Sequence, residues 1–119
     1  QSLPHVVGSA EKLQQVFLNL IINAIQAMPS GGSIIITSGS TGEEVFATVN
    51  DTGKGIPAND LEHIFEPFYT TKDGGSGLGL SISNQVVRIH GGRIIARSTP
   101  GKGTEMTVCL PFNERRHKA

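Results

Sequence analysis

The sequence has little of three things: cysteine, net charge and long apolar runs. Its single cysteine, Cys109, cannot form a disulfide within the chain, and we expect it to be a small buried hydrophobe. Ten basic and ten acidic side chains cancel to a formal net charge of zero, so no broad field marks the chain as a binder of nucleic acid or of a membrane surface. No apolar run approaches the roughly 20 residues that cross a bilayer, so we expect no membrane contact. Any anionic ligand must be held by local groups.

What the sequence does have is the size of one domain and an excess of glycine. Its 119 residues can enclose a single core, and we expect one domain over residues 1–112 and a polar tail over residues 113–119. The N-terminus has neither an initiator methionine nor the layout of a signal peptide, as expected of a fragment of a longer protein. Most of the fifteen glycines gather in clusters, which predict loops.

Apolar spacing predicts the order of the secondary structure. An N-cap at Ser9 and apolar side chains at helical spacing predict a helix as far as Met28, where Pro29 and two glycines stop it. The run Ile34–Ile36 is typical of a buried strand, and alternation near residues 45–50 predicts a second strand in a hairpin with it. The later elements are a short helix near 60–64, a mobile loop over 66–79, a helix over 78–89 and a hairpin of strands near 93–98 and 104–110.

The order helix, hairpin, helix, hairpin gives antiparallel strand pairs with the helices stacked on one face. The predicted fold class is therefore α+β, a two-layer α/β sandwich with a mixed, mostly antiparallel sheet and its helices on one side.

Uncharged polar side chains form a stripe on the first helix. At about 100° per residue, Gln15, Asn19, Asn23 and Gln26 fall on one line, and we expect this line opposite the apolar face that contains Leu20. One interpretation is that these amides hydrogen-bond neighbouring backbone. The other is that carboxamide oxygens complete the shell of a Mg²⁺ whose other ligands are phosphates and water.

Two glycine-rich segments allow both a structural and a functional interpretation. Asp51-Thr52-Gly53-Lys54-Gly55 is common turn chemistry, but its carboxylate could also accept a hydrogen bond from the amino group of adenine. Gly75-Ser76-Gly77-Leu78-Gly79 leads into a helix, so its backbone N–H groups could hold phosphates. It sits in no βαβ unit and lacks the lysine of a P-loop, which argues against those two kinds of nucleotide site.

Taken in order, five segments resemble the motifs of one family, the catalytic ATP-binding domain of sensor histidine kinases. The same fold is found in gyrase, the Hsp90 chaperones and MutL. The matching segments are residues 19–24 (N box), 51–56 (G1 box), 65–72 (F box), 77–82 (G2 box) and 101–104, the small glycine motif.

The resemblance implies a domain that binds ATP and Mg²⁺ and presents the γ-phosphate to a histidine on a separate dimerisation domain of the same parent kinase. A response regulator downstream and a cytoplasmic location, with the parent possibly membrane-anchored, are implied too. Asn23 is implied as the Mg²⁺ ligand with Asn19 beside it, and Lys72 is our candidate for meeting phosphate charge. The implied ATP-binding residues are Asn19, Asn23, Ala27, Asp51, Gly53, Gly55, Ile56, Phe65, Thr71, Lys72, Gly75, Ser76, Gly77, Leu78, Gly79, Leu80 and Thr104.

Two departures from the family pattern bear on activity. Gln26 stands where histidine kinases often carry a basic residue, and Asn19 stands where the ATPase relatives carry the glutamate that activates water. The alternatives are a gyrase or Hsp90-type ATPase switch, a serine kinase of the anti-sigma type, and a regulatory module that binds nucleotide without passing phosphate on. None of the four histidines is followed by an acidic residue, so we expect the phosphoacceptor outside this sequence.

Overall fold

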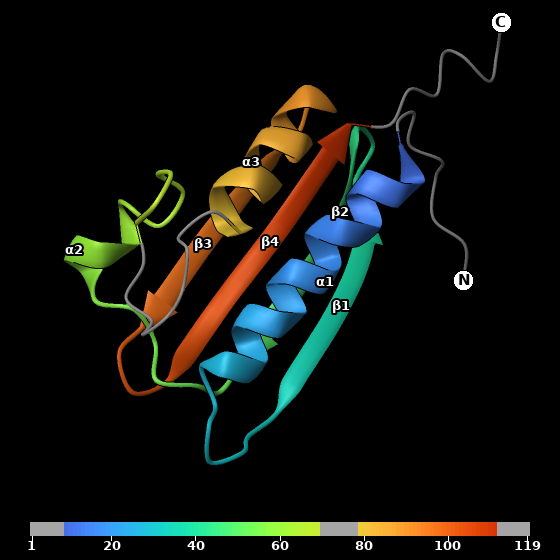
Figure 1. Ribbon diagram of the computed structural model, residues 1–119. Helices are drawn as coiled ribbons and strands as arrows, with labels where there is room; N and C mark the ends of the chain where they lie inside the picture. The colour runs from blue at the N-terminus through green and yellow to red at the C-terminus, as the bar shows by residue number, and fades with distance from the viewer. Residues whose placement is uncertain (1–8, 70–78, 112–119) are drawn as a thin grey trace, which may run out of the picture.

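The computed structural model describes residues 9–69 and 79–111, which form a four-stranded sheet with the helices α1 and α3 packed on one of its faces (Figure 1). This arrangement confirms the predicted two-layer α+β fold. The predicted loop lies largely outside the described residues, as does the expected polar tail. The elements are α1 (Ala10–Gln26), β1 (Ile34–Ser40), β2 (Glu44–Asp51), α2 (Ala58–Leu61), α3 (Gly79–Ile89), β3 (Arg93–Thr99) and β4 (Gly103–Pro111).

Both long helices begin or end on the predicted signals. The Ser9 hydroxyl accepts a hydrogen bond from the Lys12 amide at 3.3 Å, which confirms the N-cap of α1. At the end of α3, the Gly91 N–H donates to the Arg88 carbonyl and the Gly92 N–H donates to the Val87 carbonyl, both at 2.9 Å. This pattern is a Schellman motif, so the two glycines stop the helix as predicted.

The two hairpins join along their inner strands. The strand order is β1-β2-β4-β3, and every pairing among the described strands is antiparallel, with Asp51 of β2 opposite Thr104 of β4. Helix α1 packs against the inner strand β2 and α3 packs against the outer strand β3. The most deeply buried side chains lie between the two layers. They are Val16, Leu20, Val49, Val87 and Val108.

The prediction that Ile34–Ile36 forms a buried strand was wrong. Ile35 and Ile36 are 59% and 56% exposed. Strand β1 pairs with β2 alone and is an edge of the described sheet, beyond the strands that the helices cover. A β-branched run fits a pleated strand whether that strand is central or at an edge, and only the pairing order decides which.

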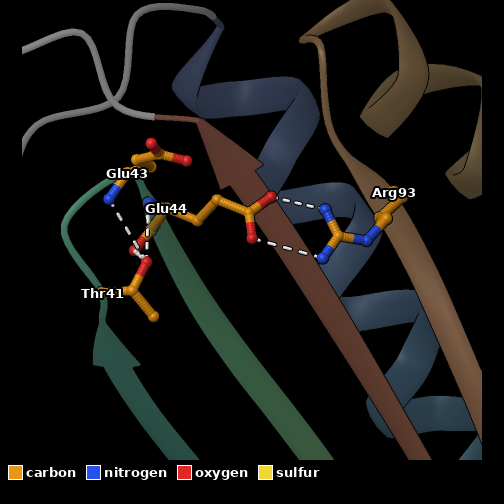
Figure 2. Close-up of polar contacts among 4 residues, drawn as sticks. All are labelled: Thr41, Glu43, Glu44 and Arg93. Carbon is orange, nitrogen blue, oxygen red and sulfur yellow. Dashed lines mark hydrogen bonds and ion pairs between the residues drawn. The ribbon is translucent and has the colours of Figure 1, made fainter.

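An ion pair between Arg93 and Glu44 lies on the sheet face away from the helices. Figure 2 shows the Arg93 guanidinium donating to both carboxylate oxygens of Glu44, at 2.5 and 3.2 Å. This pair joins β3 to β2 across β4.

Cys109 on β4 is buried, with 7% of the residue exposed. The expectation of a small buried hydrophobe is confirmed, and burial raises the pKa of this thiol.

Within the described parts of the chain, no helix has the length and apolar character needed to cross a membrane.

Candidate nucleotide-binding site

A cavity of about 580 Å³, including its open mouth, lies between α1 and the adjoining ends of β2 and β4. The described residues that line it are Leu20, Asn23, Ala24, Gln26, Ala27, Val49, Asp51, Lys54, Gly55, Ile56, Leu80, Thr104 and Met106. The fold thus brings the predicted residues of the N box, the G1 box and Thr104 to one place.

Asp51 is the buried acidic group of this cavity. It ends β2, and its side chain is 7% exposed. Its Oδ1 accepts hydrogen bonds from the backbone N–H of Gly53 at 2.8 Å and of Thr104 at 3.2 Å. Two fixed donors on one oxygen hold the plane of the carboxylate, so that it is oriented before any ligand arrives.

The backbone that follows Asp51 is tied to three other elements. The Lys54 N–H donates to the Ala27 carbonyl at the end of α1, and the Lys54 carbonyl accepts from the Gly101 N–H in the β3–β4 turn, at 3.2 and 2.7 Å. The Ile56 N–H donates to the Ser98 hydroxyl at 2.7 Å. This loop is therefore a rigid wall, and Ser98 is a supporting residue that the sequence analysis missed.

Both glycines of this loop lie so close to the backbone of another segment that a side chain would not fit. A Cβ on Gly53 would lie 2.6 Å from the Ala27 carbonyl oxygen. Gly55 has φ +77°, and a Cβ there would lie 2.3 Å from the Thr99 carbonyl oxygen. Any larger residue would push the loop away from α1 or from the β3–β4 turn and so open the cavity wall.

The amide stripe of α1 lies differently from the prediction. Asn23 and Gln26 line the cavity together with Leu20 and Ala24. The stripe therefore borders the buried face, and the expectation that it lies opposite was wrong. Because Leu20 and Asn23 are three residues apart, they stand about 60° apart around the helix, close enough to share one cavity.

Asn19 is used to join the two helices. Its Nδ2 donates to the Gly79 carbonyl at 2.7 Å and to the Ser83 hydroxyl at 3.0 Å. Gly79 begins α3, and a Cβ there would meet the Asn19 amide at 3.0 Å. Asn19 lies outside the cavity lining, where it sets the position of the first turn of α3 against α1.

Several lining residues carried no chemical signal in the sequence. Val49 and Met106 face each other across the β2–β4 pairing, and with Leu20 and Ala24 they make the inner wall apolar. Their alternation along the strands marked them as core, and only the pairing of β2 with β4 makes them the wall of a site. An apolar wall beside one fixed carboxylate suits a flat ring with a polar edge.

The remaining predicted site residues fall into two groups. Gly53 supports the cavity wall without lining it, and Phe65 is half-buried against the core. Thr71, Lys72, Gly75, Ser76, Gly77 and Leu78 lie outside the described residues.

The donor set of the described residues limits how a metal could be held. No group of three or more histidine, cysteine, aspartate or glutamate side chains in these residues could hold an ion. An amide oxygen in the cavity wall, such as that of Asn23, fits a Mg²⁺ that takes its other ligands from phosphates and water.

A pocket that pairs one buried carboxylate with an apolar wall and a helix beginning nearby has features that suit a nucleotide. The chain matches the family described as histidine kinase-, DNA gyrase B- and HSP90-like ATPases over residues 8–114 and belongs to it. Nucleotide use is therefore part of its function.

The relatives are multidomain sensor kinases. The chain is 46% identical over 112 residues to the sensor histidine kinase ZraS of Escherichia coli O157:H7, covering 94% of this chain and 24% of that protein. It is 41% identical over 105 residues to sporulation kinase C of Bacillus subtilis (strain 168), covering 88% of this chain and 24% of the relative. The chain thus spans about a quarter of the length of these kinases.

Solved structures agree with these matches. A mycobacterial sensor histidine kinase, MprB, superposes with a TM-score of 0.81 at 32% identity over 89% of this chain and 74% of the other. The nucleotide-free catalytic domain of histidine kinase ThkA gives 0.79 at 36% identity over 89% of this chain and 71% of the other.

Proposed function

We propose that the chain is the ATP- and Mg²⁺-binding catalytic domain of a sensor histidine kinase, acting on a histidine outside this sequence. The observation that carries the proposal is the buried Asp51, whose Oδ1 is held by two backbone donors. Its Oδ2 is then the oxygen that accepts the amino group of adenine. Guanine presents a carbonyl at that edge, so the same carboxylate disfavours GTP.

The other end of the cavity is suited to the triphosphate. Asn23 offers an amide oxygen to Mg²⁺, and Leu80 brings the first turn of α3 to the cavity. The bound Mg²⁺ supplies charge stabilisation for the phosphoryl group that is transferred. Asn19 holds the beginning of α3 in place, and Lys72 is the residue we expect to meet further phosphate charge.

Asn19 provides no base for water. Asn19 occupies the position of the ATPase glutamate, and its Nδ2 donates to α3. An amide that donates two hydrogen bonds does not take a proton from water, so hydrolysis is expected to be slow. This observation favours the kinase over the ATPase switch.

The described histidines are engaged away from the cavity. The Nε2 of His90 accepts from the Ser9 N–H at 2.9 Å while its Nδ1 lies 2.7 Å from the Val86 carbonyl oxygen. His63 pairs with Glu66 at 2.6 Å. Neither lines the site, which supports a phosphoacceptor elsewhere.

The partner we propose is a histidine-bearing dimerisation domain of the same parent protein, with a response regulator downstream and a cytoplasmic site of action. The domain itself is proposed to span residues 1–112. These proposals rest on the family and on the length of the relatives beyond the matched part.

Incubation with γ-labelled ATP tests the function. The chain alone should bind ATP, stay unlabelled and turn it over slowly, whereas the dimerisation domain of the parent should become labelled on an acid-labile, base-stable bond when it is added. Rapid turnover by the chain alone, abolished by Asn23→Ala, would replace the kinase with the ATPase switch.

A further inference from the structure

Asp51, Thr104 and Ser98 lie in one row across three strands. Asp51 of β2 is opposite Thr104 of β4, and Thr104 is opposite Ser98 of β3. Residues that are directly opposite in antiparallel strands share a face of the sheet. Asp51 and Thr104 line the cavity, whereas Ser98 stands behind Thr104 and outside the lining. Any influence of Ser98 on a bound ligand is therefore exerted through its neighbours.

The Ser98 hydroxyl makes three hydrogen bonds. Its Oγ accepts from the Ile56 N–H at 2.7 Å. The same Oγ lies 2.9 Å from the Gly103 carbonyl oxygen and 2.8 Å from the Oγ1 of Thr104. A hydroxyl group has one proton to donate and two lone pairs that accept. The three contacts therefore use the whole hydrogen-bonding capacity of this side chain.

The bond between the two hydroxyls can run in one direction only. A carbonyl oxygen cannot donate, so Ser98 must give its one proton to the Gly103 carbonyl. Ser98 then has no proton left for Thr104, and Thr104 must donate its own hydroxyl proton to Ser98. The Oγ1 of Thr104 is left with lone pairs alone to offer to a ligand in the cavity.

Two acceptors are therefore offered to the cavity side by side. Asp51 contributes Oδ2, because its Oδ1 is already held by the N–H groups of Gly53 and Thr104. Thr104 is only 6% exposed, so bulk water does not readily supply a donor in its place. An edge made of acceptors matches a ligand edge that donates, such as an amino group, and opposes a carbonyl oxygen.

We infer that Ser98 is a positioning residue for base selectivity, because by holding the Thr104 proton it keeps Thr104 an acceptor beside Asp51. The inference rests on the proposed function and adds to it a residue that does not line the cavity. Without the Ser98 hydroxyl, Thr104 can turn its proton toward the ligand and donate to a carbonyl. The preference for an amino group over a carbonyl then falls.

The test compares ATP with inosine triphosphate, which carries a carbonyl in place of the amino group, by calorimetry on the full parent protein. Ser98→Val and Ser98→Thr are a matched pair of similar shape, of which only the threonine keeps a hydroxyl. The ratio of ATP affinity to inosine triphosphate affinity should fall about tenfold in Ser98→Val and change by less than about twofold in Ser98→Thr. Ser38→Ala, at an exposed serine of β1 outside the cavity, is the control and should leave the ratio unchanged.

The affinity ratio separates selectivity from mere support of the loop. Loss of the Ile56 hydrogen bond alone would weaken both nucleotides alike, and a loss of folded protein cancels when both are titrated into one preparation. Should Ser98→Val not fold, Ser98→Ala removes the same hydroxyl without adding volume. In a Thr104→Val background no hydroxyl proton remains to be redirected, so Ser98→Val should no longer change the ratio.

Two results would overturn the inference. One is an equal ratio in the variants with and without a hydroxyl at position 98, and the other is a full effect of Ser98→Val in the Thr104→Val background. Failure of the unsubstituted parent to bind ATP, or to prefer it to inosine triphosphate, would instead overturn the proposed function.

Discussion

The two ends of the cavity are built in different ways. At the Asp51 end, backbone hydrogen bonds hold the loop over residues 51–56 to the end of α1 and to the β3–β4 turn, and the Thr104 N–H donates to the Asp51 side chain. At the α3 end, the described link between the helices is the side chain of Asn19. The first end is held largely through the backbone, whereas the second includes a link made by a side-chain amide.

This difference matches the two tasks that we propose. Recognition of a flat base needs an acceptor fixed in advance, because the selectivity of a hydrogen bond comes from the cost of leaving it unmade. Phosphoryl transfer needs an end that can admit the triphosphate, the metal ion and an incoming histidine. We expect substitutions at the first end to weaken nucleotide binding more than substitutions at the second.

The largest effect is expected from Asp51→Ala. Losing the acceptor for adenine costs about 1–3 kcal/mol, which weakens ATP binding by roughly ten- to a hundredfold. Calorimetry with ATP and GTP measures it, and the variant should also lose the preference for ATP. Asn50→Ala is the control, because the neighbouring Asn50 is exposed and outside the cavity. Unchanged ATP affinity in Asp51→Ala would contradict the proposal that Asp51 accepts the amino group of adenine.

Next in size is the loss of the link between the helices. Asn19→Ala should lower the free energy of unfolding by about 1–2 kcal/mol, since the Ser83 hydroxyl is 2% exposed and would lose its partner. Urea denaturation measures this change. The double variant with Ser83→Ala should cost less than the sum of the two single variants, because both remove the same bond. Strict additivity would show that Asn19 does not act through Ser83.

A smaller gain is expected from Gln26→Lys in the cavity wall. Gln26 lines the cavity one turn from Asn23, and a cation there adds an exposed ion pair with phosphate worth about 0.2–1 kcal/mol. Affinity should rise about two- to fivefold for ATP and not at all for adenosine. The gain should shrink in high salt, and an equal gain for adenosine would rule out a phosphate contact.

The smallest effect is a dependence of fold stability on pH. It comes from His63, which lies in a turn outside both ends of the cavity. The hydrogen bond that His63 donates to the Glu66 carboxylate raises the pKa of His63 above its ordinary value of 6.5, and the charges of Glu62 and Asp60 raise it further. A raised folded-state pKa stabilises the fold fully below pH 6.5, and that contribution is lost as pH rises through the folded-state pKa.

An NMR titration of the imidazole measures the shift. Glu66→Gln should return the pKa of His63 toward its ordinary value, and Glu62→Gln should do so by less, because its contact is longer, 3.4 Å against 2.6 Å. Equal shifts from both variants would show that charge alone, without the hydrogen bond, raises this pKa.

Local signals predicted the elements and the fold class well. The helix ends at Ser9, Gly91 and Gly92 depend on contacts within a few residues, so they can be predicted directly from the sequence. The edge position of Ile35 and Ile36 was missed, since the strand pairing that decides it joins segments far apart in the chain. The site residues 71–78 lie outside the described residues, so their roles remain predictions.

By itself, the sequence determined which chemistry is present: an acidic residue after a strand, amides on one helix, and glycines where backbones meet. These follow from residue type and spacing alone. The tertiary structure decided how each group is used. Pairing β2 with β4 set the Thr104 amide against Asp51 and made Val49 and Met106 a cavity wall, and packing α3 on α1 turned Asn19 into a link between helices. The physical reason is that hydrogen-bond partners and burial depend on neighbours distant in sequence, which local spacing does not encode.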